Sequence, residues 1–210
     1  MPDWEKIFEE KGHVFVEPHS DMSRLATLFR MEEITRILDV GCGTGRHLVY
    51  FSRAGFEMFG FDSSKIALDL AVKWLKDEEL DADFRLSKME DPFPYSDEHF
   101  DAVISIQVIH HNLKNDILKT VGEIERVLKI GGYIFITVPI LGPKPENPEE
   151  DWKLLPVEDG TFIPQSGPES GIPHHYFTEE ELHEVFGNFK ILEMYLDDTN
   201  HRCVLAIRES

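Results

Sequence analysis

Glycine stands at every second position of one short loop, where an apolar run over residues 37–40 ends. Glycine suits a backbone that takes positive φ, or one that a ligand approaches without a Cβ in between. A helix is expected over residues 46–54, and its first free N–H groups would point back at the loop. Such a loop can seat a polar or anionic ligand, and the glycines that form it are Gly41, Gly43 and Gly45.

Asp62 directly follows the next apolar run, residues 56–61. It lies about 20 residues beyond the first glycine. A carboxylate in that place, at the end of the second strand, accepts hydrogen bonds from ribose hydroxyls. A plain structural turn is the alternative interpretation of the glycines, but such a turn usually needs one glycine rather than three. The loop and the carboxylate therefore agree on a ligand that carries a ribose.

The spacing of the glycines separates two kinds of loop. The dinucleotide fingerprint reads G-x-G-x-x-G, whereas Arg46 stands at its sixth position here. The stretch L-D-V-G-C-G-T-G, with the pattern D-x-G-x-G-x-G, resembles the first motif of the class I S-adenosylmethionine-dependent methyltransferases of the small single-domain type. The resemblance implies S-adenosyl-L-methionine as cofactor and S-adenosyl-L-homocysteine as product. It also implies that Asp39 helps to hold the ammonium end of the cofactor and that Cys42 supplies a backbone contact.

Two later stretches carry the same resemblance. The run F-D-x-V-x-S from Phe100 and the trailing V-I-H-H match the family's fourth motif, which implies that Gln107 borders the cofactor. Residues 87–93 take the place of the family's adenine-binding loop, D-A-E-E-L-P-F, with Ser87 at the usual carboxylate position and Met89 left to cover the ring. The expected cofactor contacts are Asp39, Gly41, Cys42, Gly43, Gly45, Asp62, Ser63, Lys88, Met89 and Gln107.

Hydrophobic periodicity predicts alternating strands and helices along most of the chain. After the first two strands, further strands are expected near residues 82–86, within 99–111, and near 133–138, 190–196 and 203–207. Gly131 and Gly132 are expected to end a helix that begins at Lys114, and a capping box of Thr178 and Glu181 to begin the last helix. The expected fold is α/β, a Rossmann-like, doubly wound seven-stranded sheet with helices on both faces. The resemblance implies a mostly parallel sheet whose last strand is antiparallel.

The composition changes sharply after the fifth expected strand. Eight of the twelve prolines fall between Pro139 and Pro173, and proline at this density argues against helix or central strand. We expect one methyltransferase domain over residues 1–210, with an N-terminal helical cap over 1–35 and a proline-rich insertion over 139–176 that serves as a substrate lid. A mobile surface loop is the alternative for the insertion.

Histidines gather at two places beside the expected cleft, at the end of the fourth strand and at the end of the insertion. An activated methyl group chiefly needs its acceptor atom held in line, with one group to take a proton, so no catalytic triad has to appear. The alternatives are a satisfied histidine at a strand end, a residue that begins the next helix, and solvated loop residues. No spacing matches a known metal-ligand motif, so no metal is expected, although a site from His110, His111, His174 and His175 stays open. The catalytic residues are unknown, and the candidates are His110, His111, His175 and Tyr176.

The formal net charge of −19 bears on the partners of the protein. A polyanionic surface repels phosphate backbones, so nucleic acid is not an expected partner. The chain shows no run that could span a membrane and no cysteine pair that suggests a disulfide, so we expect a cytoplasmic protein, either a monomer or a homodimer. We expect a methyltransferase that acts on a small-molecule acceptor. The alternative is a non-catalytic S-adenosylmethionine-binding sensor or partner protein.

Overall fold

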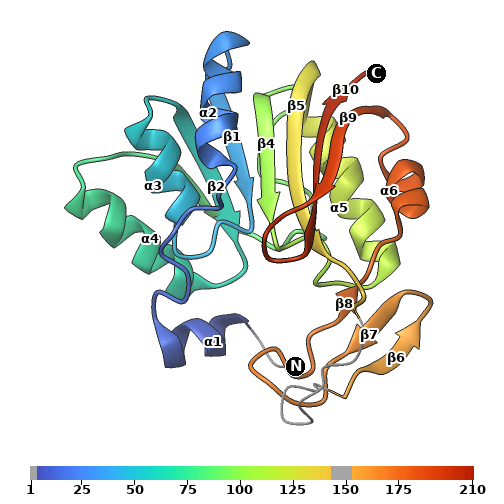
Figure 1. Ribbon diagram of the computed structural model, residues 1–210. Coiled ribbons are helices and arrows are strands. Elements are labelled where there is room, and N and C mark those ends of the chain that lie inside the picture. The colour runs from blue at the N-terminus through green and yellow to red at the C-terminus, as the bar shows by residue number, and fades with distance from the viewer. Residues whose placement is uncertain (1–3, 143–152) are drawn as a thin grey trace.

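A seven-stranded sheet forms the centre of the computed structural model, which describes residues 4–142 and 153–210 (Figure 1). The strands of this sheet are β1 (Arg36–Val40), β2 (Glu57–Asp62), β3 (Asp83–Leu86), β4 (Phe100–Ile106), β5 (Leu128–Pro139), β9 (Phe189–Leu196) and β10 (His201–Arg208). Their order is β3-β2-β1-β4-β5-β10-β9; the strands from β3 to β5 are parallel, whereas β10 pairs antiparallel with both of its neighbours. The expected sheet, mostly parallel with an antiparallel last strand, is confirmed.

Helices cover both faces of this sheet (Figure 1). The helices are α1 (Trp4–Lys11), α2 (Met22–Met31), α3 (Arg46–Arg53), α4 (Lys65–Asp77), α5 (Lys114–Val127) and α6 (Glu179–Val185). Successive side chains of a strand point to opposite faces. Ile37 and Phe135 are therefore buried with α2, α3 and α4, whereas Leu38 and Ile136 are buried with α5 and α6. These two cores confirm the doubly wound arrangement.

The start of β5 differs from the expectation. Gly131 does not end a helix, because α5 already ends at Val127 and β5 begins at Leu128. Leu128 pairs with Phe100, and regular pairing resumes further along at Ala102 after a register shift. Gly131 lies between these points with φ +78°, which is typical of a β-bulge. The glycine therefore serves a bulge inside the strand, and the expected helix end is wrong.

A second, three-stranded antiparallel sheet lies within the expected insertion, made of β6 (Leu155–Glu158), β7 (Thr161–Ile163) and β8 (His174–His175). Proline is compatible with this sheet because Pro156 lies in β6, an edge strand. The expectation that the proline-rich stretch holds no central strand is therefore wrong, because β7 lies between β6 and β8. Residues 143–152 of the insertion and residues 1–3 of the N-terminal cap lie outside the described residues. This sheet and α1 lie at the carboxyl ends of the parallel strands (Figure 1).

α6 begins with half of the expected capping box. Thr178 Oγ1 accepts a hydrogen bond from the Glu181 N–H at 3.1 Å, as expected for an N-cap. The Glu181 carboxylate does not complete the box, because it forms an ion pair with Lys114 and lies 3.1 Å from His175 Nε2. The Thr178 cap therefore confirms the expected start of the helix. The Glu181 side chain instead contacts residues outside the helix.

Substitution of Gly41 tests how tightly the loop after β1 packs against Val108. The φ of Gly41 is +71°, and a Cβ there would lie 2.5 Å from Val108 Cγ1. Gly41→Ala should lower the free energy of unfolding in urea by about 2–5 kcal/mol, because a left-handed backbone penalty of about 1–2 is joined by overpacking of about 1–3. Gly55→Ala is the matched control, because Gly55 has φ +92° with open space beside it and should lose only the backbone penalty. Equal losses would contradict the close approach of Val108.

Candidate active site

The loop between β1 and α3 is tied to the end of β2 by backbone hydrogen bonds. The Gly41 N–H donates to the Phe61 carbonyl at 3.0 Å. The Gly43 N–H donates to Asp62 Oδ2 at 2.8 Å. Gly41, Gly43 and Gly45 all have positive φ, at +71°, +53° and +90°. The three glycines therefore allow a tight turn that brings the start of α3 against the carboxylate of β2.

Asp62 is a buried carboxylate that keeps capacity for further donors. Besides the Gly43 N–H, it accepts the Ser64 N–H on Oδ1 at 2.9 Å. Burial raises the pKa of Asp62 to about 6, although these backbone hydrogen bonds oppose the shift, and the nearby Asp39 adds to it. Each carboxylate oxygen has two lone pairs, so both can still accept a hydroxyl hydrogen. Burial also raises the pKa of the Cys42 thiol well above its usual value. The thiol is therefore protonated at neutral pH and a poor nucleophile, and the expected role of Cys42 is a backbone contact.

Asp39 offers an acceptor that no described residue satisfies. Its side chain is buried, and Oδ2 has no hydrogen-bond partner among residues 4–142 and 153–210. His47 Nδ1 lies 3.7 Å from this atom. His47 Nε2 accepts the His19 N–H at 3.2 Å, so the hydrogen of the neutral ring sits on Nδ1, and burial lowers the pKa of the ring. A buried acceptor left open in this way fits a cationic ligand group such as an ammonium.

The other expected cofactor contacts lie around this loop with partners of their own. Gln107 has φ +63°, and its N–H and its side-chain Nε2 both donate to Thr137 Oγ1 at 3.0 Å. Met89 is half-buried and packs against the core on the α5 side. Ser63 and Lys88 are exposed. The structure thus ties Gln107 to β5, and the roles of these four residues stay predictions.

α1 lies across the glycine loop and the start of α4. The Glu5 carboxylate accepts hydrogen bonds from the Ser64 hydroxyl and, at 3.3 Å, from the Ile66 N–H. Phe8 is buried, and its Cζ lies 3.6 Å from the position of a Cβ on Gly43. The N-terminal helix therefore covers the loop that we expect to hold the cofactor.

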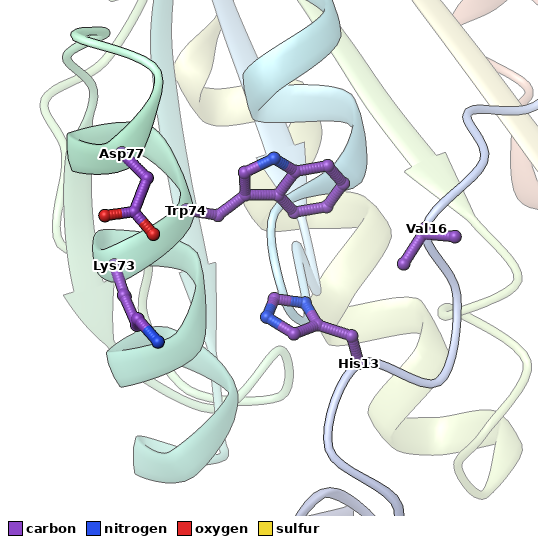
Figure 2. A pocket seen from close by; sticks show the side chains of 5 residues that line it. All are labelled: His13, Val16, Lys73, Trp74 and Asp77. Atoms are coloured by element: carbon purple, nitrogen blue, oxygen red, sulfur yellow. The ribbon is translucent and has the colours of Figure 1, made fainter.

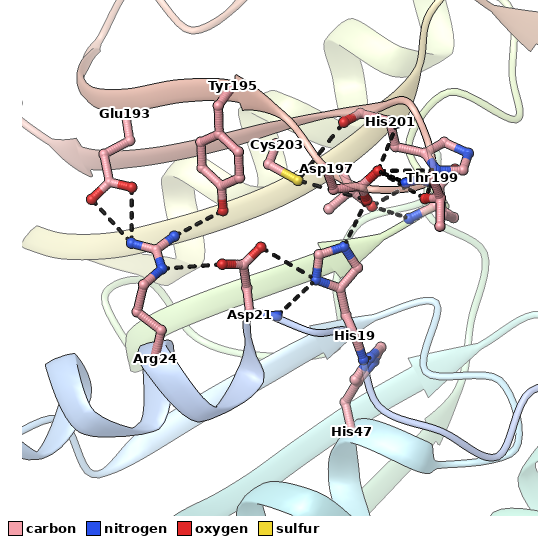
Figure 3. Close-up of polar contacts among 12 residues, drawn as sticks. His19, Asp21, Arg24, His47, Glu193, Tyr195, Asp197, Thr199, His201 and Cys203 are labelled. Carbon is pink, nitrogen blue, oxygen red and sulfur yellow. Dashed lines mark hydrogen bonds and ion pairs between the residues drawn. The ribbon is translucent and has the colours of Figure 1, made fainter.

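The segment after α1 is fastened to the hairpin of β9 and β10 (Figure 3). His19 Nδ1 accepts the Asp21 N–H at 3.2 Å, so its Nε2 carries the hydrogen and donates to Asp197 Oδ2 at 3.0 Å. Arg24 of α2 donates to the Glu193 carboxylate of β9 at 2.8 Å. These contacts hold the N-terminal segment against the last two strands.

A shallow pocket of about 220 Å³ lies between α4 and the segment after α1 (Figure 2). Its lining residues are His13, Val16, Lys73, Trp74 and Asp77. The rings of His13 and Trp74 meet edge to face with centroids 5.4 Å apart. None of the expected site residues lines this pocket, so we regard it as a surface groove beside the cap.

The two histidines after β4 meet the end of the inserted segment. The ring centroids of His110 and His111 lie 3.8 Å apart, and those of His111 and His174 lie 4.7 Å apart. Glu169 Oε2 lies 2.7 Å from His174 Nε2 and 3.7 Å from His111 Nε2. The His175 N–H donates to the His110 carbonyl at 2.8 Å. The fold therefore brings together two histidine groups that are far apart in the sequence.

Burial governs the charge of this cluster. It lowers the pKa of His111, and it lowers the pKa of His110 well below the usual range, with the neighbouring histidines adding to the effect. Burial opposes the ionisation of Glu169, but hydrogen bonds from His111 and His174 hold its pKa at about 2. The cluster therefore sets an ionised carboxylate beside His110 and His111, which are neutral near pH 7.

The two candidates from the end of the insertion have different surroundings. His175 is fully buried; its Nδ1 lies 2.7 Å from Thr161 Oγ1, and its Nε2 lies 3.1 Å from Glu181 Oε2. Tyr176 is half-buried, and burial, together with the charge of Glu169, raises the pKa of its hydroxyl. The His175 ring therefore anchors the small sheet, whereas Tyr176 keeps a protonated hydroxyl at neutral pH.

Sequence reasoning missed three residues of this region. His47 stands in the first turn of α3, and its closeness to the glycine loop in the chain could have linked it to Asp39. Glu5 lies on a short acidic helix, and nothing local indicates that it contacts the start of α4. Glu169 lies among prolines and glycines, without a periodic pattern that would point to His174.

Comparison with known proteins finds similarity to methyltransferases over part of the chain. Residues 38–136 match the family model described as a methyltransferase domain. The chain is 32% identical over 109 residues to the ubiquinone biosynthesis O-methyltransferase of Alkalilimnicola ehrlichii, which covers 52% of this chain and 43% of that protein. It is 31% identical over 149 residues to the tRNA (carboxymethyluridine(34)-5-O)-methyltransferase of Arabidopsis thaliana, which covers 65% of this chain and 34% of that protein. The chain spans less than half the length of these curated relatives.

A solved structure supports the fold over the whole chain. An S-adenosylmethionine-dependent methyltransferase from Clostridium acetobutylicum is similar with a TM-score of 0.74 at 15% identity, and the match covers 99% of this chain and 98% of that chain. At this identity the similarity confirms the Rossmann-like fold alone. In the part of the chain that the structure describes, no helix combines the length and the apolar character needed to cross a membrane.

If Asp62 binds the cofactor as expected, its raised pKa predicts pH-dependent cofactor binding. Because burial raises this pKa to about 6, the carboxyl group gains a proton between pH 7.5 and pH 5 and becomes a poorer acceptor for ribose hydroxyls. The affinity for S-adenosyl-L-homocysteine, measured by calorimetry, should therefore fall about tenfold over this range. Asp62→Asn is the matched control, and it should bind more weakly with a flat profile. A flat profile in the wild type would contradict the role of Asp62.

Proposed function

We propose that the chain carries a class I, S-adenosylmethionine-dependent methyltransferase domain. In this proposal it transfers the sulfonium methyl group of S-adenosyl-L-methionine to an oxygen atom of a small-molecule acceptor. When bound, the cofactor supplies a methyl group that is already activated for an in-line displacement. The protein therefore chiefly has to position the acceptor. The observation that carries the proposal is that Asp39 and Asp62 are buried near the carboxyl ends of β1 and β2, while the histidine cluster begins just after β4.

We assign the cofactor side to the glycine loop and its two acids. Asp39 Oδ2 is the open acceptor for the ammonium group of the methionine part, because no described residue satisfies it. Asp62 accepts the ribose hydroxyls with lone pairs that the Gly43 and Ser64 N–H groups leave open. The positive φ of the glycines lets the backbone approach the ligand.

We assign the acceptor side to three segments that meet at His111. The Trp4 ring lies 4.8 Å from the His111 ring in an edge-on arrangement, so the cap reaches the end of β4. Tyr176 of the insertion has its ring 6.4 Å from that of His174, and its protonated hydroxyl can donate to an acceptor oxygen. In this proposal residues 1–35 cover the cofactor, residues 139–176 form the substrate lid, and the whole chain is one domain.

The charge of the chain favours a small acceptor over RNA. One relative acts in ubiquinone biosynthesis and another on tRNA, and the names of both place the methyl group on oxygen. With 40 acidic residues against 21 lysines and arginines, this chain repels a phosphate backbone. Cys42 and Cys203 are free and buried, which suits a cytoplasmic protein, and we propose a monomer or homodimer.

The experiment that tests this function uses methyl-labelled S-adenosylmethionine. The protein is incubated separately with a metabolite extract and with total tRNA, and the products are read by mass spectrometry. We expect label in a small molecule and none in tRNA. Label in tRNA alone would overturn the choice of acceptor. Tight cofactor binding without transfer in either mixture would support a non-catalytic binding protein.

Tyr176→Phe tests the acceptor side once a product is known. Leaving the acceptor oxygen without this hydrogen bond costs about 1–3 kcal/mol, so kcat/KM should fall roughly 5- to 150-fold. The affinity for S-adenosyl-L-homocysteine should stay within about threefold, because the change lies on the acceptor side. Tyr50→Phe on α3, whose ring packs on Phe51, is the control and should retain full activity. Unchanged kinetics for Tyr176→Phe would remove this residue from the site.

A further inference from the structure

We propose that His110, His111, His174 and Glu169 bind a divalent transition-metal ion such as Zn²⁺ at the end of β4. One ring nitrogen of each histidine lies within 4.8 Å of those of the other two. Glu169 Oε2 lies 2.7 Å from His174 Nε2 and 3.7 Å from His111 Nε2. Four donors from two distant segments therefore converge, and this inference does not depend on methyl transfer.

The contacts of His174 require either a proton or a metal ion between its Nε2 and Glu169. Its Nδ1 lies 2.9 Å from the Ile172 carbonyl oxygen, which can only accept, so Nδ1 carries the ring hydrogen. In a neutral ring Nε2 is then a bare acceptor, and it faces the carboxylate of Glu169 at 2.7 Å. Two acceptors at this distance need a proton or a metal ion between them.

His110 supplies the second indication of a ligand. It is 2% exposed, and its Nδ1 has no hydrogen-bond partner among the residues that the structure describes. A buried polar atom that is left unpaired destabilises the folded protein. A metal ion shared with His111 and His174 would give this nitrogen a partner. A proton shared by His174 and Glu169 would leave it without one.

Three imidazoles and one carboxylate match the preferences of Zn²⁺ and similar ions, whereas Mg²⁺ and Ca²⁺ prefer oxygen ligands. The Nδ1–H of His174 donates to a backbone carbonyl, which is the contact that orients a metal-bound histidine. Ligand atoms about 2.0–2.1 Å from a tetrahedral ion lie roughly 3.4 Å apart, so modest ring rotations would complete the site.

A second group of possible ligands lacks this character. His19, Asp197 and Cys203 also lie close together. Both ring nitrogens of His19 already have hydrogen-bond partners, at Asp21 and Asp197. Burial raises the pKa of the Cys203 thiol to about 12, so it is a poor source of thiolate. The buried Nδ1 of His110, which has no hydrogen-bond partner among the described residues, therefore distinguishes the His110 cluster.

Binding of Zn²⁺ to the full-length protein, stripped with a chelator, tests the proposal by calorimetry and by elemental analysis. We expect one ion per chain with a Kd below about 1 µM, little response to Mg²⁺, and a rise in Tm with Zn²⁺. His174→Ala should bind Zn²⁺ at least about 100-fold more weakly and should lose the rise in Tm. His183→Ala is the matched control, because His183 is exposed on α6, and it should bind as the wild type does.

The affinity for S-adenosyl-L-homocysteine checks that the variants are folded, and it should stay within about threefold in His174→Ala. If His174→Ala does not fold, Glu169→Gln provides the second variant, with the same expected loss of Zn²⁺ affinity. Two results would overturn the proposal: wild type that binds no Zn²⁺, or His174→Ala that binds Zn²⁺ as tightly as wild type. The contact between His174 and Glu169 would then be explained by a shared proton. Wild type that methylates its acceptor but binds no Zn²⁺ would overturn this inference alone and leave the proposed function intact.

Discussion

One hydrogen bond, from the Gly43 N–H to the Asp62 carboxylate, fixes how the ends of β1 and β2 meet. It turns the loop after β1 toward β2, and Asp39 keeps an open oxygen at the same edge. Two buried acids in a chain of net charge −19 are unfavourable by themselves, and backbone amides offset this for Asp62. These protein contacts set the shape of the loop that we propose to hold the cofactor.

Sequence reasoning succeeded where the cause of a structure is local. The strand–loop–helix unit at Gly41 and the cap at Thr178 follow from backbone conformation and from side chains a few residues away. It failed where the cause is a distant partner. The bulge at Gly131 exists because Leu128 pairs with Phe100, and Glu181 turns from its own helix toward His175. Such choices depend on tertiary contacts that no short window contains.

The acceptor side shows the same limit more strongly. Sequence reasoning named its histidines as candidates because of their residue type. It did not predict the small sheet of β6, β7 and β8 that groups them, because the high proline content argued against strands. Glu169 gains its role only because this sheet places it against His174 and His111. A partly buried carboxylate among imidazoles loses hydration, and a cation beside it offsets this cost, so the fold retains a specific electrostatic arrangement here.

The place of β10 constrains how this chain is made. β10 pairs with both β5 and β9, and β9 has β10 as its one neighbour in the seven-stranded sheet. Residues 201–208 must therefore leave the ribosome before β9 can join. During synthesis at roughly 5–20 residues per second, β5 has an unpaired edge until then, and such edges promote association between nascent chains. Chaperones that shield sheet edges would matter for this protein in that interval.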